Sequence, residues 1–311
     1  MTYMPLHAAR SEVVPVRLHR YHVRVWGDVA TSLPPLVLMH GWMDVGASYQ
    51  FMVDALSNDF LAGRLIIAPD WRGFGHTSGP PCDHYSFADY LGDLEALLDH
   101  YAGDRPVDLV GHSMGGNVVM LYAGARPARV RRLVNLEGFG MPATRPAQAP
   151  GRYARWLDEI KSLHAGDLAL NTYADDAGVA ERLMKTNRRL PQDQALWLAR
   201  QWAEPRQSAD GTTRWHVLGD AAHRIINPQL YRVDEVQALY GHITAPTLMI
   251  EAEDDSLTGW WKGKFTLDEF HQRLSAVPNV LRVVLPDCGH MLHHDQPARL
   301  ARELEVFLQT P

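Results

Sequence analysis

A serine flanked by glycines lies at the boundary between an expected strand and an expected helix. An apolar run at 107–110 precedes Gly111-His-Ser-Met-Gly115, and helical spacing of apolar residues begins near Met114. This order suits a nucleophile elbow, because the glycines leave room for a turn so tight that Ser113 is strained. The helix that begins there points amide groups and its positive dipole end at the reacting centre. The alternative is an ordinary glycine-rich turn with an incidental serine.

A serine hydroxyl becomes an effective nucleophile only when a base removes its proton and an acid orients that base. Candidates for both follow later apolar strands. The strand at 245–251 leads into acidic residues that include Asp255, and the strand at 280–285 leads into His290. Open α/β sheets bind ligands at the carboxyl ends of their strands. We therefore expect Ser113, an acid and His290 to meet at one edge of a sheet.

The elements that must position these residues alternate between strand and helix. Apolar runs predict strands at 16–26 (a strand or a hairpin), 36–40, 64–69, 107–110, 130–136, 245–251 and 280–285. Helical spacing predicts helices at 48–60, 86–101, from Met114 onward, 267–276 and 297–309. This order predicts an α/β fold with a mostly parallel, doubly wound sheet that is covered by helices on both faces.

The composition changes at Gly140. Three prolines within 141–151 favour a linker, and the pattern at 152–240 is helical, rich in aromatic residues and without a parallel strand. We therefore expect an α/β core formed by residues 1–140 and 242–311. An inserted helical cap is expected at 141–241.

The overall composition excludes several classes of partner. The 311 residues are 46% hydrophobic and 21% charged, and the net charge of −6 argues against nucleic acid or an anionic membrane surface. The first residues lack the basic start and following apolar stretch of a secretory signal, so we expect none. No apolar run approaches the roughly 20 residues of a membrane span. Two distant cysteines suit reduced thiols. We expect a cytoplasmic protein whose partner is a small-molecule substrate; the oligomeric state is not predicted.

Several motifs together resemble the α/β-hydrolase fold family. They are His40-Gly-Trp42, the D-x-R-G-x-G-x-S segment at 70–78, the elbow at 111–116 and Cys288-Gly-His290. The resemblance covers nearly the whole chain outside the cap. The segment at 215–231 is most similar to the serine-hydrolase-like branch of the family.

The resemblance implies a role for each matching residue. Ser113 would be the nucleophile, and His290 the general base and then the general acid. The main-chain amides of Trp42 and Met114 would form the oxyanion hole. A serine at position 113, where dehalogenases and epoxide hydrolases carry an aspartate, argues against both of those chemistries.

Three carboxylates compete for the role of the acid. The family's usual spacing, counted from Ala252, selects Asp255. Glu137 ends the strand after the elbow helix, where some family members place their acid, and it ranks second. Asp254 ranks third, because a shift of one position would select it.

Residues near these motifs offer further candidates. We predict that His40, Trp156 and Trp260 contact the substrate; for His40, as for His112, the alternative is to fix the loops by hydrogen bonds. Among sixteen histidines, the group formed by His290, His293 and His294 raises the question of a metal site. No H-E-x-x-H motif is present. We therefore predict a histidine-rich surface near the last helix, no metal and no organic cofactor.

These observations predict a serine hydrolase that cleaves an ester through an acyl-enzyme on Ser113. The tryptophans of the cap favour a small to medium, fairly apolar substrate. Carbon–carbon bond hydrolysis, lactone opening and acyl transfer use the same triad and remain open. The competing class is a receptor that binds a small ligand on this fold without turnover.

Overall fold

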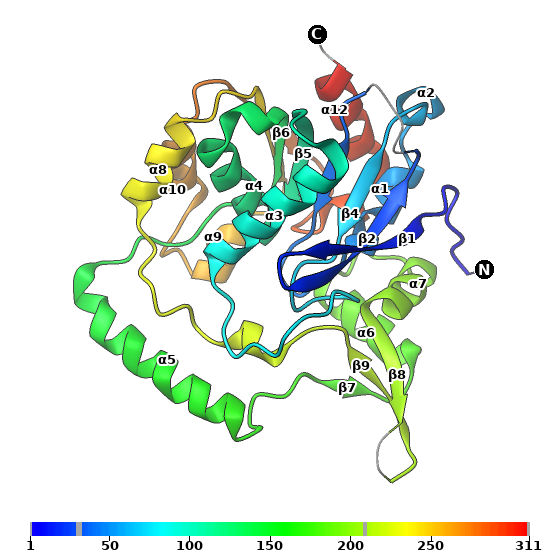
Figure 1. The fold of residues 1–311 in the computed structure, drawn as a ribbon, viewed down its shortest axis with the longest axis vertical. Helices are drawn as coiled ribbons and strands as arrows, with labels where there is room; N and C mark the ends of the chain where they lie inside the picture. The colour runs from blue at the N-terminus through cyan, green and yellow to red at the C-terminus, as the bar shows by residue number, and fades with distance from the viewer. Residues whose placement is uncertain (1, 29–32, 208–209, 310–311) are drawn as a thin grey trace.

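The computed structural model describes residues 2–28, 33–207 and 210–309. An eight-stranded sheet forms the centre of the fold (Figure 1). The strands are β1 (Arg10–Val16), β2 (His19–Trp26), β3 (Leu36–Met39), β4 (Ile66–Pro69), β5 (Val107–His112), β6 (Val130–Leu136), β10 (Thr247–Ala252) and β11 (Val280–Leu285). Their spatial order is β1-β2-β4-β3-β5-β6-β10-β11. β2 pairs antiparallel with β1 and β4, and the other neighbours pair in parallel. The carboxyl ends of β5, β6, β10 and β11 therefore lie at one edge.

Helices cover both faces of this sheet, and each face has its own apolar core. One face packs against α3 (Phe87–Ala102), α4 (Met114–Ala125), α8 (Val233–Gly241) and α10 (Leu267–Leu274). The other packs against α1 (Gln50–Asp54), α2 (Asn58–Leu61), α11 (Leu292–Asp295) and α12 (Pro297–Gln309). The doubly wound α/β architecture expected from the sequence is confirmed. No helix within the described ranges is long and apolar enough to cross a membrane.

One predicted helix is broken. The segment expected to be helical at 48–60 forms a 3-10 turn, η1 (Gly46–Tyr49), followed by α1 and, after a gap, α2. Ser57 begins the second helix, because its hydroxyl accepts a hydrogen bond of 3.2 Å from the amide of Phe60. A serine at this position caps a new helix instead of continuing the old one.

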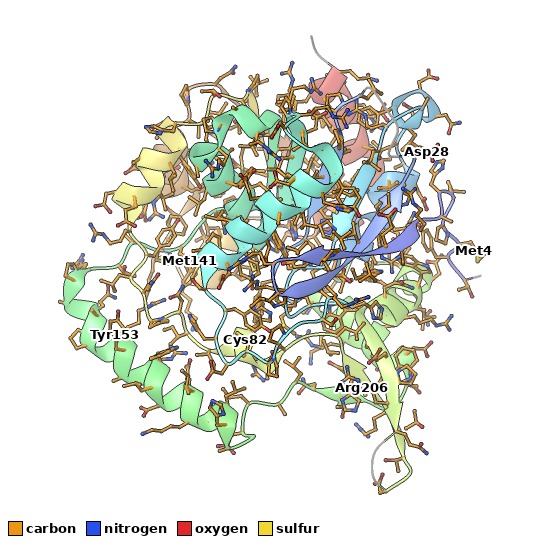
Figure 2. The ribbon with its side chains drawn as sticks, in the orientation of Figure 1. Met4, Asp28, Cys82, Met141, Tyr153 and Arg206 are labelled. Atoms are coloured by element: carbon orange, nitrogen blue, oxygen red, sulfur yellow. The ribbon has the colours of Figure 1, made fainter. Side chains whose placement is uncertain are left out.

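The segment between β6 and β10 contains a small sheet that the helical pattern did not predict. Before α8, this segment contains α5 (Ala149–His164), β7 (Thr172–Tyr173), α6 (Asp176–Thr186), α7 (Gln192–Trp202), β8 (Ala203–Gln207), β9 (Thr213–Val217) and η4 (Ala221–Arg224). The strands form an antiparallel sheet in the order β7-β9-β8, and Figure 2 places Arg206 on β8. Exposed, charged side chains on β8 and β9 weaken the alternating pattern that identifies a strand in a sequence.

Two helices of this segment have different surroundings. α8 lies within the predicted cap at 141–241, but Val236 and Tyr240 are buried in the core cluster that α4 also lines. The core therefore begins again before residue 242, at α8. α5 has no buried residue and runs along the outside of the molecule, with Tyr153 on it (Figures 1 and 2).

Candidate active site

Ser113 occupies a strained turn between β5 and α4. Its backbone has φ 52° and ψ −114°, a conformation that residues other than glycine rarely adopt. A Cβ on Gly115 would collide with the carbonyl oxygens of Met39 and His40, and one on Gly111 would collide with the backbone of Gly115. The geometry is that of a nucleophile elbow, and the glycines are there for the steric reason that the sequence predicted.

His290 lies in the loop after β11 and faces a carboxylate. Its Nδ1 is 3.3 Å from Oε2 of Glu137. The Glu137 carboxylate also accepts hydrogen bonds from the Ala252 amide (2.7 Å) and from the Ser256 hydroxyl (3.0 Å). Three elements thus meet at this carboxylate, because Glu137 follows β6, Ala252 ends β10 and Ser256 begins α9 (Ser256–Trp261).

Of the three candidate acids, the structure places Glu137, ranked second, beside His290, and not Asp255 or Asp254. Asp255 is exposed, and its carboxylate accepts a hydrogen bond of 2.8 Å from the Thr258 amide, which caps α9. Asp254 pairs with Arg189 at 2.6 Å on the surface. Glu137 is 2% exposed and has φ 57°, so the turn after β6 is strained and directs its side chain inward. The family spacing selected Asp255, but the local backbone engages that carboxylate in capping.

Burial changes the protonation of both partners. Burial raises the pKa of Glu137 to about 8, against the hydrogen bonds from Ala252 and Ser256, which lower it. Burial lowers the pKa of His290 to about 3. The imidazole is therefore neutral over the ordinary pH range, which is the state that a general base requires.

Ser113 and His290 are linked through His112, the last residue of β5. The only partner of His112 Nε2 among the described residues is the carbonyl oxygen of His290, at 2.8 Å, so this nitrogen donates. The rings of His112 and His290 lie 4.7 Å apart. No hydrogen bond joins Ser113 Oγ to His290 in the described part of the chain. Such bonds are often long without substrate and tighten in the reacting complex.

The two amides expected to form the oxyanion hole lie on segments that adjoin Ser113. A Cβ placed on Gly41, next to Trp42, would lie 3.2 Å from Ser113 Cβ, so the two turns are in contact. Met114 is the first residue of α4, whose first-turn amides have no partner within the helix. The indole nitrogen of Trp42 donates to the His223 carbonyl (3.3 Å), which anchors this loop to η4.

The three predicted substrate contacts have different positions. His40 is fully buried, with Nδ1 2.7 Å from the Gly41 carbonyl and Nε2 accepting from the Trp71 amide at 2.8 Å. It therefore fixes loops, and the prediction that it contacts substrate is wrong. The Trp260 ring lies edge-on to His290 at 4.2 Å. Trp156 lies on α5, near the ring of His84.

A cavity of about 600 Å³ lies between the small sheet and the core. Its lining is partly polar and includes Thr77, Asn171, Arg206, His216 and Asp220. Neither Ser113 nor His290 lines it.

The histidines after His290 are not on the surface. His293 is fully buried and His294 is 4% exposed, which corrects the prediction of a histidine-rich surface. The Ser48 hydroxyl lies 3.1 Å from Nε2 of His293 and 2.6 Å from Nε2 of His294. α11 packs against η1 and α1 and so turns both rings inward. Together with Asp44 and His112, His293 forms the group of side chains that could hold a metal ion.

Sequence reasoning missed Ser256. Its hydroxyl donates to the carboxylate that faces His290, so it favours the ionised form of Glu137. It follows Asp255 directly, at the end of an acidic run in which only the carboxylates were candidates for the acid. A hydroxyl directly after the acidic run that follows β10 is the only signal the sequence offered.

Comparison with known proteins supports the same fold. A family model described as alpha/beta hydrolase fold matches residues 34–297. The chain is 38% identical over 110 residues to 2-hydroxy-6-oxo-2,4-heptadienoate hydrolase of Pseudomonas putida, covering 34% of this chain and 38% of that protein. It is 30% identical over 146 residues to serine hydrolase-like protein of Danio rerio, covering 46% and 42%. These matches span less than half of either relative.

Other relatives and solved structures extend the comparison. Epoxide hydrolases are among the other relatives. The thioesterase domain from the curacin biosynthetic pathway superposes with a TM-score of 0.77 at 24% identity, over 96% of this chain and 99% of that one. At this identity the superposition concerns the fold alone. The strained serine, the sheet order and the family match over most of the chain agree, and the chain belongs to the α/β-hydrolase fold family.

Proposed function

We propose that this protein is a serine hydrolase that cleaves a carboxylic ester through an acyl-enzyme on Ser113. One observation carries the proposal: a strained serine and a histidine–carboxylate pair lie at the same edge of one sheet. Ser113 follows β5, His290 follows β11 and Glu137 follows β6. In this family an aspartate nucleophile, not a serine, would be required for epoxide opening through an alkyl-enzyme ester.

The reaction transfers one proton back and forth through His290. Nε2 of His290 takes the Ser113 proton while Oγ attacks the carbonyl carbon, and the amides of Trp42 and Met114 stabilise the oxyanion. When the tetrahedral intermediate collapses, the same nitrogen returns the proton to the leaving alkoxide. Water then repeats the sequence on the acyl-enzyme, which releases the acid and restores Ser113.

Glu137 is the acid of the proposed triad. Its Oε2 is the carboxylate oxygen that approaches His290 Nδ1, at 3.3 Å. When ionised, it accepts a hydrogen bond from Nδ1–H of His290, which leaves Nε2 free to act as the base, and it stabilises the imidazolium that forms during attack. Asp255 instead acts as the cap of α9.

A small, fairly apolar acyl or alcohol group suits the surroundings of this pair. The Trp260 side chain is 53% exposed and the Trp42 side chain 52% exposed, and Trp260 borders the His290 ring. Indole faces offer apolar area to a substrate at low conformational cost.

A fluorophosphonate probe tests the nucleophile directly. We expect covalent labelling of Ser113, located by mass spectrometry of the modified peptide, and sustained hydrolysis of a short-chain aryl ester. Ser113→Ala should abolish both. Stoichiometric binding of the ester without sustained turnover would instead favour a receptor, and labelling at another serine would overturn the proposal.

Hydrolysis of a carbon–carbon bond is the second candidate. It is favoured by the relative from Pseudomonas putida, whose name describes a 2-hydroxy-6-oxo-2,4-heptadienoate hydrolase. The same serine, histidine and acid serve both reactions. Assay of that dienoate beside the aryl ester, in wild type and Ser113→Ala, separates the two by the ratio of kcat/KM.

A further inference from the structure

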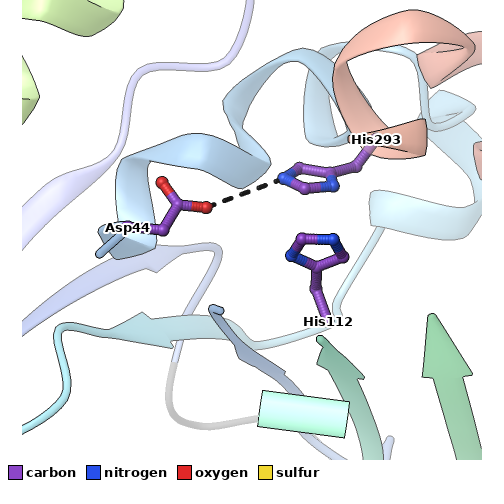
Figure 3. A group of neighbouring side chains, drawn as sticks. All are labelled: Asp44, His112 and His293. Atoms are coloured by element: carbon purple, nitrogen blue, oxygen red, sulfur yellow. Dashed lines mark ion pairs between the residues drawn. The ribbon is translucent and has the colours of Figure 1, made fainter. Parts of the chain in front are cut away.

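Three buried side chains from separate segments point toward a common centre behind the elbow (Figure 3). Asp44 belongs to the loop before η1, His112 ends β5 and His293 lies on α11. Each offers one ligand atom, and these atoms lie within 4.8 Å of one another. The proposed reaction uses neither Asp44 nor His293.

The group contains acceptor atoms that no protein donor satisfies. Oδ2 of Asp44 and Nδ1 of His112 are buried and have no hydrogen-bond partner among the described residues. Because Nε2–H of His112 donates a hydrogen bond to the His290 carbonyl, Nδ1 of the neutral ring carries a free lone pair. Buried polar atoms are nearly always paired, so these two require an explanation.

The carboxylate also lacks a cation. Its only ion-pair partner among the described residues is His293, whose Nε2 lies 3.9 Å from Oδ2. Its Oδ1 accepts the Val45 amide at 2.9 Å, but no Lys or Arg side chain among the described residues pairs with the carboxylate. A buried carboxylate without a cation is costly, and a bound metal ion is one way in which proteins remove that cost.

We propose that Asp44, His112 and His293 form a buried site for one divalent transition-metal ion, for which Zn²⁺ is the appropriate probe. Two imidazole nitrogens and one carboxylate oxygen are ligands that Zn²⁺ accepts in proteins. Metal–ligand bonds of about 2.0–2.2 Å place tetrahedral ligand atoms roughly 3.4 Å apart. Small side-chain rotations therefore close the group around the ion, and the Ser48 hydroxyl, 3.1 Å from His293 Nε2, lies beside the site.

The position of the site connects it to the candidate active site. His112 precedes Ser113 and also holds the His290 loop through its Nε2–H. An ion on Nδ1 would fix the ring that joins the nucleophile loop to the base loop. We therefore expect Zn²⁺ to slow ester hydrolysis; this consequence rests on the proposed function, whereas metal binding itself does not.

Metal binding is measured without turnover. The full chain, freed of metal with a chelator, is dialysed against Zn²⁺ and its bound zinc is counted; we expect one tightly bound equivalent. Asp44→Asn keeps the oxygen that accepts the Val45 amide and removes the charge, so it should fold and bind this equivalent about 10–100-fold more weakly. His293→Gln should behave similarly. The control His164→Gln, at an exposed histidine, should bind like the wild type.

X-ray absorption of the Zn²⁺-loaded wild type tests the ligand set even if a variant fails to fold. Two imidazoles and one carboxylate are expected. Unchanged zinc affinity in Asp44→Asn and His293→Gln, a ligand set without two imidazoles, or no tight equivalent in the wild type would each overturn the site. Tight binding without inhibition would remove only the link to hydrolysis, and hydrolysis without metal binding would leave the proposed function intact.

Discussion

The backbone conformation at single residues determines which carboxylate faces His290. Glu137 has φ 57° and is directed inward, whereas Asp255 accepts the Thr258 amide at the start of α9. Two residues with the same chemistry thus have different roles, because one side chain is buried beside the base and the other is exposed.

Exchange of each carboxylate for its amide separates these roles. We expect Glu137→Gln to lower kcat by about 10³–10⁴-fold, because an amide favours the wrong tautomer of His290. Asp255→Asn should stay within about threefold of wild type, since asparagine caps a helix as well as aspartate does. Steady-state hydrolysis of an aryl ester measures both; the opposite pattern would restore Asp255 as the acid.

The pH dependence of kcat/KM reports the same pair. The active form has Glu137 ionised and His290 neutral, and burial raises the pKa of Glu137 to about 8. Activity should therefore rise with pH through an acidic limb near 8, above the value of about 6.5 for an ordinary histidine.

Two variants move that limb in opposite directions. Ser256→Ala removes a hydrogen bond that favours the carboxylate, so the limb should move up by about one pH unit. Asp255→Asn removes a negative charge that raises the pKa of Glu137, so the limb should move down. A limb near 6.5 that neither variant moves would argue against Glu137.

At the scale of elements, α4 is held between the elbow and α8. A Cβ on Gly124 would collide with the carbonyl of Leu239 on α8, so this glycine permits a close approach of the two helices. The close packing explains why α8 packs with the core although it lies within the cap predicted at 141–241.

Alanine at two helical glycines tests this packing. Gly124→Ala should lower the free energy of unfolding by about 1–3 kcal/mol, because the helices must separate. Gly151→Ala, on α5, meets nothing within 4 Å and should be neutral or stabilising by about 0.5–1 kcal/mol. Chemical denaturation of both variants measures the difference, and equal effects would show that α8 is loosely packed.

The elements at the site could largely be predicted from the sequence. The ranges read from apolar runs agree closely with β6 and β11, and the range read from helical spacing agrees with α12. β6 is a largely buried parallel strand, β11 is an edge strand whose residues are nearly all apolar, and α12 is an amphipathic helix. The small sheet of β7, β8 and β9 could not be predicted, because strands with exposed, charged side chains lack an alternating apolar pattern. The break before α2 depends on a hydrogen bond of Ser57.

The whole molecule buries many neutral histidines, and this sets its response to acid. Burial lowers the pKa of seven of them: His19, His40, His112, His223, His290, His293 and His294. It raises the pKa of three carboxyl groups, Asp44, Asp108 and Glu137. At pH 5 the unfolded chain protonates the histidines, whereas the folded chain retains more protons on the carboxyl groups.

The histidines whose pKa is lowered by burial outnumber the carboxyl groups whose pKa is raised, so acid should destabilise the fold. Near pH 5 the unfolded state therefore binds more protons than the native state, and stability should fall as pH decreases from 7 to 5. Denaturation midpoints measured across this range in chelator-treated protein check the prediction. A midpoint that is constant or that rises on acidification would contradict it.

The sequence by itself determined the order of strands and most helices in the α/β core, the strained serine of the elbow and the histidine after the last strand. These features depend on local patterns: apolar periodicity, glycines at fixed spacing and residues at strand ends. Only the tertiary structure decided which carboxylate faces His290, that His40 fixes loops, and that Asp44, His112 and His293 converge. Those outcomes depend on the direction in which each side chain leaves its turn and on burial by segments distant in the chain, which no local pattern encodes.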